Sequence, residues 1–328
     1  MNFQSNLFRE VSPETIQKIF AGALHEDSIR EARLLDGGMF NTTYFVVYGQ
    51  EGNERQAVLR LGPVNRERLM GFEENLMRAE EYVYALCQEI GIPCSNVLAC
   101  DTSRQLINRD FMIVEYIPSV VMSKAPLTKE QQDSLYFRLG EYLRQFHGVT
   151  GQSFGFVSRI LEGKAFSKWS DALAFEAEDM SRRLERAGGA SPEEGEAIRR
   201  PFYEERNRKL LDEIQTPHLL HTDLWAGNVL LDRDTLEVKA IIDSDRAMFG
   251  DPDFEFSSPW MNIPPMEAGY GLEPPETWSW QRKRRKLLYR SVYLLLEAYV
   301  GIGEYNNPQL YGERKEQLME TLAQLEHC

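Results

Sequence analysis

The amino-acid sequence predicts an α+β protein of two lobes, a small strand-rich lobe over residues 1–117 and a larger, mainly helical lobe over residues 118–328. Segments with strand-like alternation are concentrated before residue 118, whereas later segments repeat their apolar residues at helical spacing. A length of 328 residues suits two domains, since a domain has roughly 100–200 residues. Pro118 closes the strand-rich part, so we place the boundary between the lobes there.

The N-terminal lobe is expected to hold a helix, a hairpin, a second helix and two more strands. Ser12 and Pro13 suit the N-cap and the first position of a helix. β-Branched and aromatic residues on both sides of a polar turn predict the hairpin. Apolar residues at helical spacing predict the second helix, and Gly91 is a stop signal. In chain order the elements are expected at 12–24 (helix), 42–49 and 55–62 (hairpin), 74–91 (helix), and 95–101 and 110–117 (strands).

The C-terminal lobe is expected to be helical apart from strand pairs near residue 220. Residues 129–149 and much of 168–215 are amphipathic at helical spacing. The stretch 185–200, rich in glycine and glutamate, is predicted to be an exposed connection between helices. Residues 278–303 predict a long helix whose basic first half, including the run at 282–286, faces water and whose apolar second half is buried.

Composition excludes several classes of protein. The 51 acidic residues outnumber the 37 Lys and Arg, for a formal net charge of −14, and a field of that sign repels nucleic acid. No apolar run approaches the ~20 residues that span a bilayer, and the N-terminus has no secretory pattern. The four cysteines show no CxxC spacing. We expect a cytoplasmic monomer or homodimer without membrane or nucleic-acid partners.

One motif collects the polar residues that phosphoryl transfer requires. His221 and Asp223 form an H-x-D sequence, and Asn228 follows five residues after the aspartate. Phosphoryl transfer needs a carboxylate that orients the attacking hydroxyl and accepts its proton, and oxygen ligands that hold Mg²⁺ on the phosphates. The spacing matches a kinase catalytic loop, and Asp243, at the end of the next apolar run, can supply a second metal-binding carboxylate.

The remaining parts of a nucleotide site are found upstream. Gly37 and Gly38 are predicted to lie in a turn between two strands, where backbone N–H groups can approach phosphates closely. Arg60, on the following strand, can reach the α and β phosphates, and Glu80 of the next helix can pair with it; the helical phase favours Glu80 over Glu81. The main chain between Glu115 and Ile117 is the candidate for binding adenine.

In this order, these motifs resemble the aminoglycoside phosphotransferase and choline kinase superfamily, whose members are small-molecule kinases with a protein-kinase-like fold. The resemblance covers roughly residues 30 to 260. It implies Asp223 as the catalytic base, Asn228 and Asp243 as magnesium ligands, and Asp251 as a brace for the catalytic loop. It also implies ATP or GTP with Mg²⁺, and transfer of the γ-phosphate to a small-molecule hydroxyl, as in an antibiotic such as an aminoglycoside, with a role in antibiotic resistance, or in a metabolite.

The chain departs from this superfamily at three positions. Arg60 replaces a frequent lysine, and an arginine still binds phosphate as a fork. Thr222 replaces the arginine of protein kinases, and Glu255 stands where an aspartate is common. A catalytically silent nucleotide-binding regulator is the main alternative, and a protein kinase is the next, although no A-P-E segment follows Asp243.

The acceptor is not fixed by the sequence. Acidic and aromatic residues of the helical lobe favour, slightly, a cationic or ring-bearing substrate. These residues are Glu255, Trp260, Glu267 and Tyr270. His221 is expected to orient the loop backbone, and Trp225 either covers the site or packs against it.

Overall fold

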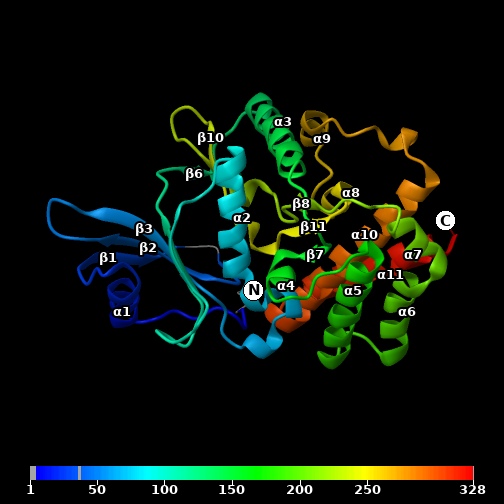
Figure 1. The fold of residues 1–328 in the computed structure, drawn as a ribbon, viewed down its shortest axis with the longest axis horizontal. Helices are drawn as coiled ribbons and strands as arrows, with labels where there is room; N and C mark the ends of the chain where they lie inside the picture. Colours follow the sequence, from blue (N-terminus) through cyan, green and yellow to red (C-terminus); the bar gives the residue numbers. More distant parts are fainter. Residues whose placement is uncertain (1–4, 36–37, 328) are drawn as a thin grey trace.

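The computed structural model describes residues 5–35 and 38–327, so Gly37 of the predicted phosphate loop lies outside the described residues. Figure 1 shows a strand-rich part on the left, a helical part on the right, and helix α2 (Leu76–Ile90) between them. The structure therefore has the predicted fold class, a β-rich N-terminal region joined to a larger helical one.

The N-terminal sheet is antiparallel, with strand order β1-β2-β3-β5-β4. Helix α1 (Pro13–Leu24) packs on one face, where Ile16, Ile19 and Phe20 meet the buried side chains of β2 and β3. The predicted elements are confirmed to within a few residues, including the Ser12 cap and the left-handed Gly91 at the end of α2. The strands are β1 (Ile29–Leu34), β2 (Thr42–Tyr48), β3 (Arg55–Leu61), β4 (Val97–Asp101) and β5 (Phe111–Glu115).

Two three-stranded sheets lie in the helical region. One has the order β10-β9-β6, from β6 (Val120–Val121), β9 (Val229–Leu231) and β10 (Val238–Ile241). The other has the order β7-β11-β8, from β7 (Gly155–Phe156), β8 (His218–Leu220) and β11 (Met248–Gly250). Because β6 pairs with β9, Val120 and Val121 already belong to the helical region. The division into two domains at residues 117 and 118 stays a prediction.

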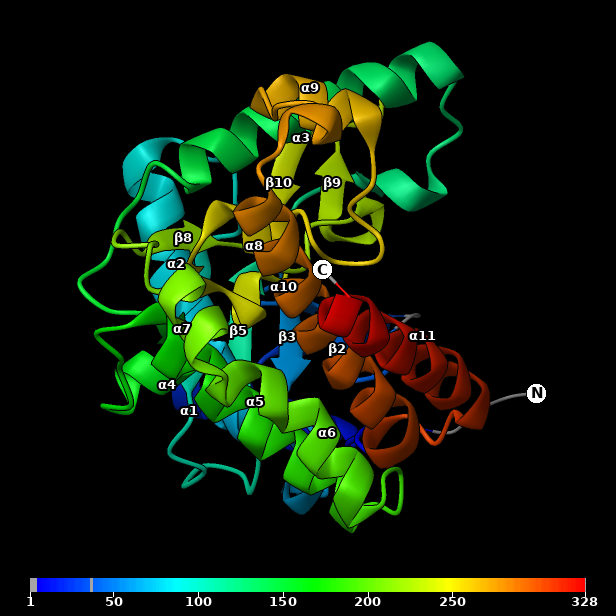
Figure 2. The ribbon, with the colours of Figure 1, turned by 90° about the vertical axis from the view of Figure 1, so that its right-hand side faces the viewer.

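Helices make up the rest of this region. Figure 2 shows α10 and α11 running side by side, and α5 packs on α10 around the buried Trp169 and Tyr289. The helices are α3 (Lys129–Phe146), α4 (Val157–Leu161), α5 (Trp169–Arg186), α6 (Pro192–Tyr203), α7 (Glu205–Leu211), α8 (Pro252–Glu255), α9 (Pro264–Tyr270), α10 (Trp280–Tyr299) and α11 (Pro308–His327).

The predicted exposed connection at 185–200 is wrong for most of its length, because α6 begins at Pro192. The Ser191 hydroxyl accepts from the Glu194 N–H at 3.2 Å, and the Glu194 carboxylate accepts from the Ser191 N–H at 2.8 Å. This reciprocal pair is a capping box, and proline at the first helical position reinforces it. The local start signals therefore outweigh the glycines that suggested a loop.

The basic half of α10 does not face water as predicted. Arg284 is 1% exposed; its Nε donates to Asn207 Oδ1 at 2.6 Å and its Nη1 to the Leu325 carbonyl at 2.7 Å. Arg282 donates to both carboxylate oxygens of Asp253 at 2.7 Å. Burial of this charge is possible because each guanidinium has fixed acceptors.

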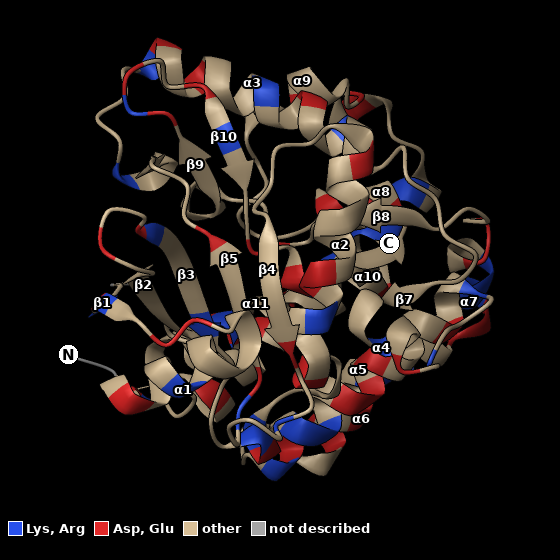
Figure 3. Ribbon diagram, turned by 60° about the vertical axis from the view of Figure 1, so that its left-hand side comes forward, with Lys and Arg blue, Asp and Glu red and all other residues tan. Residues whose placement is uncertain are grey.

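Figure 3 shows charges of both signs interspersed along α5 and α6. On α5, Arg182 forms ion pairs with Glu178 and Glu185. Within residues 5–35 and 38–327, no helix combines the length and the apolar character that crossing a bilayer requires.

Candidate active site

The loop from His221 to Asn228 connects β8 with β9 and is held by buried hydrogen bonds. The Glu255 carboxylate, which is 0% exposed, accepts from the N–H of His221 at 2.8 Å and of Thr222 at 3.0 Å. Burial acts to raise the pKa of Glu255, but His147 and the backbone donors outweigh it and lower that pKa. Thr222 has a φ of +65°, a conformation that costs free energy in a non-glycine residue, so the brace holds the loop in a strained form.

The brace is therefore Glu255, and the assignment of that role to Asp251 is wrong. The Asp251 carboxylate accepts from the Tyr289 hydroxyl at 2.8 Å and from the Asp253 N–H at 3.1 Å, which caps α8. Glutamate is one methylene longer than the aspartate common at position 255, and it reaches two successive N–H groups of the loop.

His221 orients the loop through both ring nitrogens. Nδ1 lies 3.3 Å from the N–H of Asp223 and Nε2 lies 3.3 Å from the Ile242 carbonyl. Full burial lowers the pKa of His221, so the ring is neutral near pH 7. In that form Nδ1 accepts and Nε2 donates, which satisfies both contacts. Direct proton transfer by His221 has no support in this geometry.

Asp223 is half-buried at the wall of a cavity, next to Asn228. The Asn228 amide donates to the Asp223 backbone carbonyl at 2.8 Å and to its carboxylate at 3.3 Å. Removal from water raises the pKa of Asp223 to about 7; Asp243 adds to the rise and Arg246 opposes it. A carboxylate with a pKa near neutrality is suited to accept a proton during a reaction.

Asn228 and Asp243 are brought together by the pairing of β9 with β10. Asn228 directly precedes β9, and Asp243 follows two residues after the Ile241–Val229 pair. The Ile242 N–H donates to the Asn228 carbonyl at 2.9 Å. Asp243 has a φ of +62°, a second strained position, at the residue predicted to bind metal.

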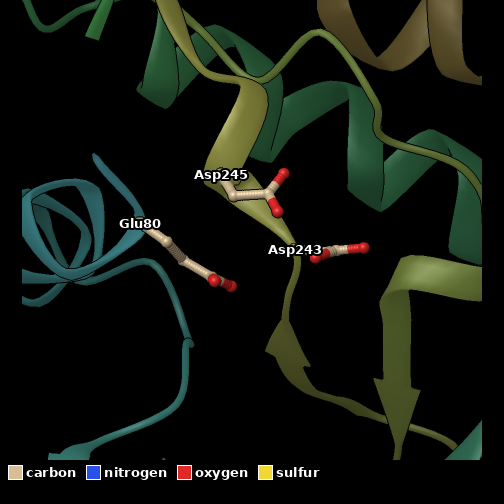
Figure 4. Close-up of side chains that lie close together, drawn as sticks. All are labelled: Glu80, Asp243 and Asp245. Carbon is tan, nitrogen blue, oxygen red and sulfur yellow. The ribbon is translucent and has the colours of Figure 1, made fainter. Parts of the chain in front are cut away.

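Arg60 lies among three carboxylates. Its Nη1 donates to Glu80 at 2.5 Å and its Nη2 to Asp243 at 2.5 Å, and Asp245 lies 3.8 Å away. Glu80 is fully buried whereas Glu81 is exposed, in agreement with the helical phase. Figure 4 shows Glu80 reaching from α2 toward the two aspartates.

Two members of this cluster were not predicted. The Tyr84 hydroxyl donates to Glu80 at 2.5 Å and accepts from the Asp243 N–H at 3.2 Å. Tyr84 is one helical turn after Glu80, and this spacing was the available signal. Asp245 is the second acid of the sequence Asp-Ser-Asp, and burial raises its pKa well above the ordinary value.

The donor set fits a hard divalent cation. Oxygen atoms of Glu80, Asp243 and Asp245 lie within 4.8 Å of one another, and Arg60, which forms ion pairs with all three, offsets a single charge. The Asn228 amide nitrogen donates to Asp223, which leaves its Oδ1 available as a ligand. Carboxylate and amide oxygens are ligands that Mg²⁺ accepts.

The predicted phosphate turn and base-binding segment lie at opposite ends of the N-terminal sheet, since Gly38 precedes β2 at the end where Thr42 pairs with Leu61, whereas Glu115 pairs with Ala57 at the other end. A Cβ on Gly38 would lie 2.3 Å from the Asn41 carbonyl, so this turn needs glycine. The Glu115 N–H donates to the Asn96 carbonyl at 2.9 Å, and the Ile117 carbonyl accepts from the Ser119 hydroxyl at 2.8 Å. No described residue accepts from the Ile117 N–H, which is free to bind a ligand.

A cavity of about 370 Å³ is lined by Asp223, Asp243 and Asp245, whereas none of the predicted nucleotide-binding residues that the structure describes is among its lining residues. Of the four residues expected to shape the acceptor site, Trp260 lines this cavity. Glu255 holds the loop and the Tyr270 hydroxyl lies 2.9 Å from His147 Nδ1, so neither of these two supports the predicted lean toward a cation.

A kinase-like phosphotransferase is the class of protein that this fold and this arrangement of residues define. The chain belongs to the phosphotransferase enzyme family, whose model matches residues 31–275, about three quarters of the sequence. The predicted relationship is thereby confirmed. No curated protein sequence matches this chain.

Solved structures share the fold. The apo form of a thermostable mutant of the aminoglycoside phosphotransferase APH(4)-Ia has 17% identity and a TM-score of 0.63, over 94% of this chain and 98% of that one. The GDP and kanamycin complex of APH(2")-IIia has 16% identity and a TM-score of 0.63, over the same 94% and 98%. Plasmodium vivax ethanolamine kinase has 12% identity and a TM-score of 0.63, over 93% and 86%.

Proposed function

We propose that this protein transfers the γ-phosphate of ATP or GTP to a hydroxyl group of a small molecule. The observation that carries the proposal is that Asp223 and Asp243, twenty residues apart in the chain, line one cavity while Arg60 reaches Asp243 from the sheet. The residues proposed as proton acceptor, metal ligand and phosphate-binding cation therefore lie close together, which supports the proposal because phosphoryl transfer requires these groups at one site.

In this proposal Asp223 orients the acceptor hydroxyl and takes its proton while the hydroxyl oxygen bonds to the γ-phosphorus. The bond between that phosphorus and the bridging β–γ oxygen breaks, and the nucleoside diphosphate leaves. Asn228 and Asp243 would hold Mg²⁺, which neutralises phosphate charge when bound. Arg60, oriented by Glu80, steadies the phosphates, Gly38 lies in the turn that approaches them, and the backbone from Glu115 to Ile117 binds the base.

The test is nucleoside diphosphate release with ATP and GTP, in Mg²⁺, against a panel of hydroxyl compounds. Asp223→Asn is expected to lower turnover by about 10²–10⁴-fold and to leave nucleotide affinity within threefold, since a general base contributes by that factor. Asp234→Asn, an exposed change on the turn after β9, is the matched control. Unchanged turnover in Asp223→Asn on an identified acceptor would overturn the assignment.

A catalytically silent nucleotide-binding regulator is the second candidate, and only the arginine at position 60 favours it. Against it, Arg60 makes the ion pairs with Glu80 and Asp243 that a lysine would make there. Arg60→Lys is expected to retain turnover within tenfold. Mg²⁺-dependent nucleotide turnover by the purified protein excludes the silent candidate, and its absence with every acceptor supports it.

A further inference from the structure

The part of the cavity beyond Asp223 is mostly apolar. Its lining residues come from the loop before β2, the loop after β8, α10 and the start of α11, among other segments. Seven side chains with an aromatic or aliphatic surface line it; they are Phe40, Trp225, Trp260, Leu296, Val300, Tyr305 and Leu310. A bound molecule would therefore bury apolar surface, which favours binding by about 25 cal/mol for each Å².

Apart from Asp223, the charged groups of the cavity already have partners. Asp243 and Asp245 face Arg60 and belong to the cation site. Glu297 lies 2.5 Å from Arg314, and Arg246 donates to Glu73 at 2.8 Å. Among the described lining residues, only Asp223 is a carboxylate without an ion-pair partner, and it faces the reacting hydroxyl in the proposed function.

A molecule with several positive charges would have little to gain in this cavity. Each ammonium group that leaves water needs a carboxylate or another hydrogen-bond acceptor to offset the loss of hydration. Beyond the cation site, the carboxylates of the lining are Asp223 and the already paired Glu297, and Asn41 and Tyr305 add only neutral side-chain acceptors. The one unpaired carboxylate matches at most one cationic group.

Trp225 forms the rim of the cavity. Trp225 is 47% exposed and lines the cavity together with Asp223, so it does not belong to the hydrophobic core. A Cβ on Gly227 would lie 2.2 Å from the Trp225 ring, so the absence of a side chain there lets the indole lie against the loop. An indole held in this way offers a flat apolar face to a ligand.

We propose that the acceptor is a hydroxyl compound with an apolar, ring-bearing body and no more than one positive charge, and not a polycation. This inference rests on the proposed function, because it names the substrate class of the same site. Trp225, Trp260 and Leu310 are the residues that select this body, and Asp223 meets its hydroxyl.

Binding measurements test the inference without a known acceptor. The uncharged fluorescent amine N-phenyl-1-naphthylamine probes the apolar wall, and kanamycin, titrated in a calorimeter at 150 mM salt, probes polycation binding. The dye is expected to bind the wild-type protein and to bind about tenfold more weakly to Trp225→Ala, as loss of part of a buried indole face implies. Kanamycin is expected to show no saturable binding.

Two further variants make the readout specific. Leu310→Asp, in the first turn of α11, places a charge in the wall and should also weaken the dye about tenfold. Trp280→Ala removes a tryptophan that is 59% exposed at the start of α10 and is absent from the cavity lining, so dye affinity should not change.

Saturable kanamycin binding, absence of dye binding, or equal loss of dye affinity in Trp225→Ala and Trp280→Ala would each overturn the inference. Failure of the proposed function is distinguishable, since it would appear as absent nucleotide turnover while dye binding remains intact. Conversely, phosphorylation of kanamycin would uphold the function and refute this substrate class.

Discussion

Asparagine at position 223 should make the protein more stable, and the gain should depend on pH. Burial raises the pKa of Asp223 from an ordinary 3.8 to about 7, which means that the folded protein disfavours the ionised carboxylate. Asparagine has nearly the same shape and no charge to ionise. The substitution therefore removes a destabilising charge at the expense of the proposed base, as expected for a functional residue.

The sign and size of the gain follow from the two pKa values. Below about pH 4 the carboxyl is protonated in both states and costs nothing. Between pH 4 and 7 the unfolded chain ionises while the folded protein does not, so stability falls by up to 1.36 kcal/mol for each pH unit. Above pH 7 the cost of the ionised carboxylate is constant, and the pKa difference sets it at about 4 kcal/mol. Because water reaches the half-buried carboxylate and screens its charge, we expect a cost of about 2–4 kcal/mol.

Thermal unfolding in EDTA, followed by circular dichroism at pH 4.5 and pH 8, is the assay. With an unfolding entropy of about 0.7 kcal/mol/K for a chain of this length, Asp223→Asn should raise Tm by about 3–6 °C at pH 8 and by little at pH 4.5. Asp234→Asn, on an exposed turn, should leave Tm unchanged at both values. An equal shift at both pH values, or a fall at pH 8, would refute the reasoning.

Two further outcomes are expected. Tyr84→Phe removes the hydroxyl that joins Glu80 to the Asp243 N–H, so kcat should fall about tenfold in an assay of nucleoside diphosphate release. Tyr82→Phe, on the exposed side of α2, should not change kcat, and equal effects of the two substitutions would contradict the role of Tyr84. Glu255→Gln leaves the N–H groups of His221 and Thr222 with one neutral acceptor, so stability should fall by about 2–3 kcal/mol in thermal unfolding; an unchanged Tm would show that the loop does not depend on this carboxylate.

The parts of the fold that were predictable from sequence are those whose patterns are local. The Ser12 cap and the Gly91 stop define their helices within a few residues of chain. The range of strand β1 was not predicted because three of its six residues, Arg30, Glu31 and Arg33, are exposed and charged, which leaves little apolar alternation to detect. The proximity of Asp223, Asn228 and Asp243 was predictable because their spacing along the chain reflects one loop and one hairpin.

Residues whose partners are distant in sequence could not be assigned in this way. Arg284 looked solvated in a basic run, and only the folded chain supplies Asn207 and the Leu325 carbonyl as its acceptors. The choice between Asp251 and Glu255 as the brace depends on which carboxylate faces the loop from His221 to Asn228. Both follow the same glycine within a few residues, so spacing alone does not separate them.

Helix α2 has a consequence for control of the enzyme. It carries Glu80 and Tyr84, yet its buried residues Ala79, Val83 and Cys87 pack in the same core as residues of α3 and β9 in the helical region. Swinging α2 outward would expose that core and separate Glu80 from Arg60. A regulator that displaced this helix would have to supply enough binding free energy to offset both the exposed core and the broken Glu80–Arg60 ion pair. We therefore expect the activity to depend on the concentrations of acceptor and nucleotide and not on movement of α2.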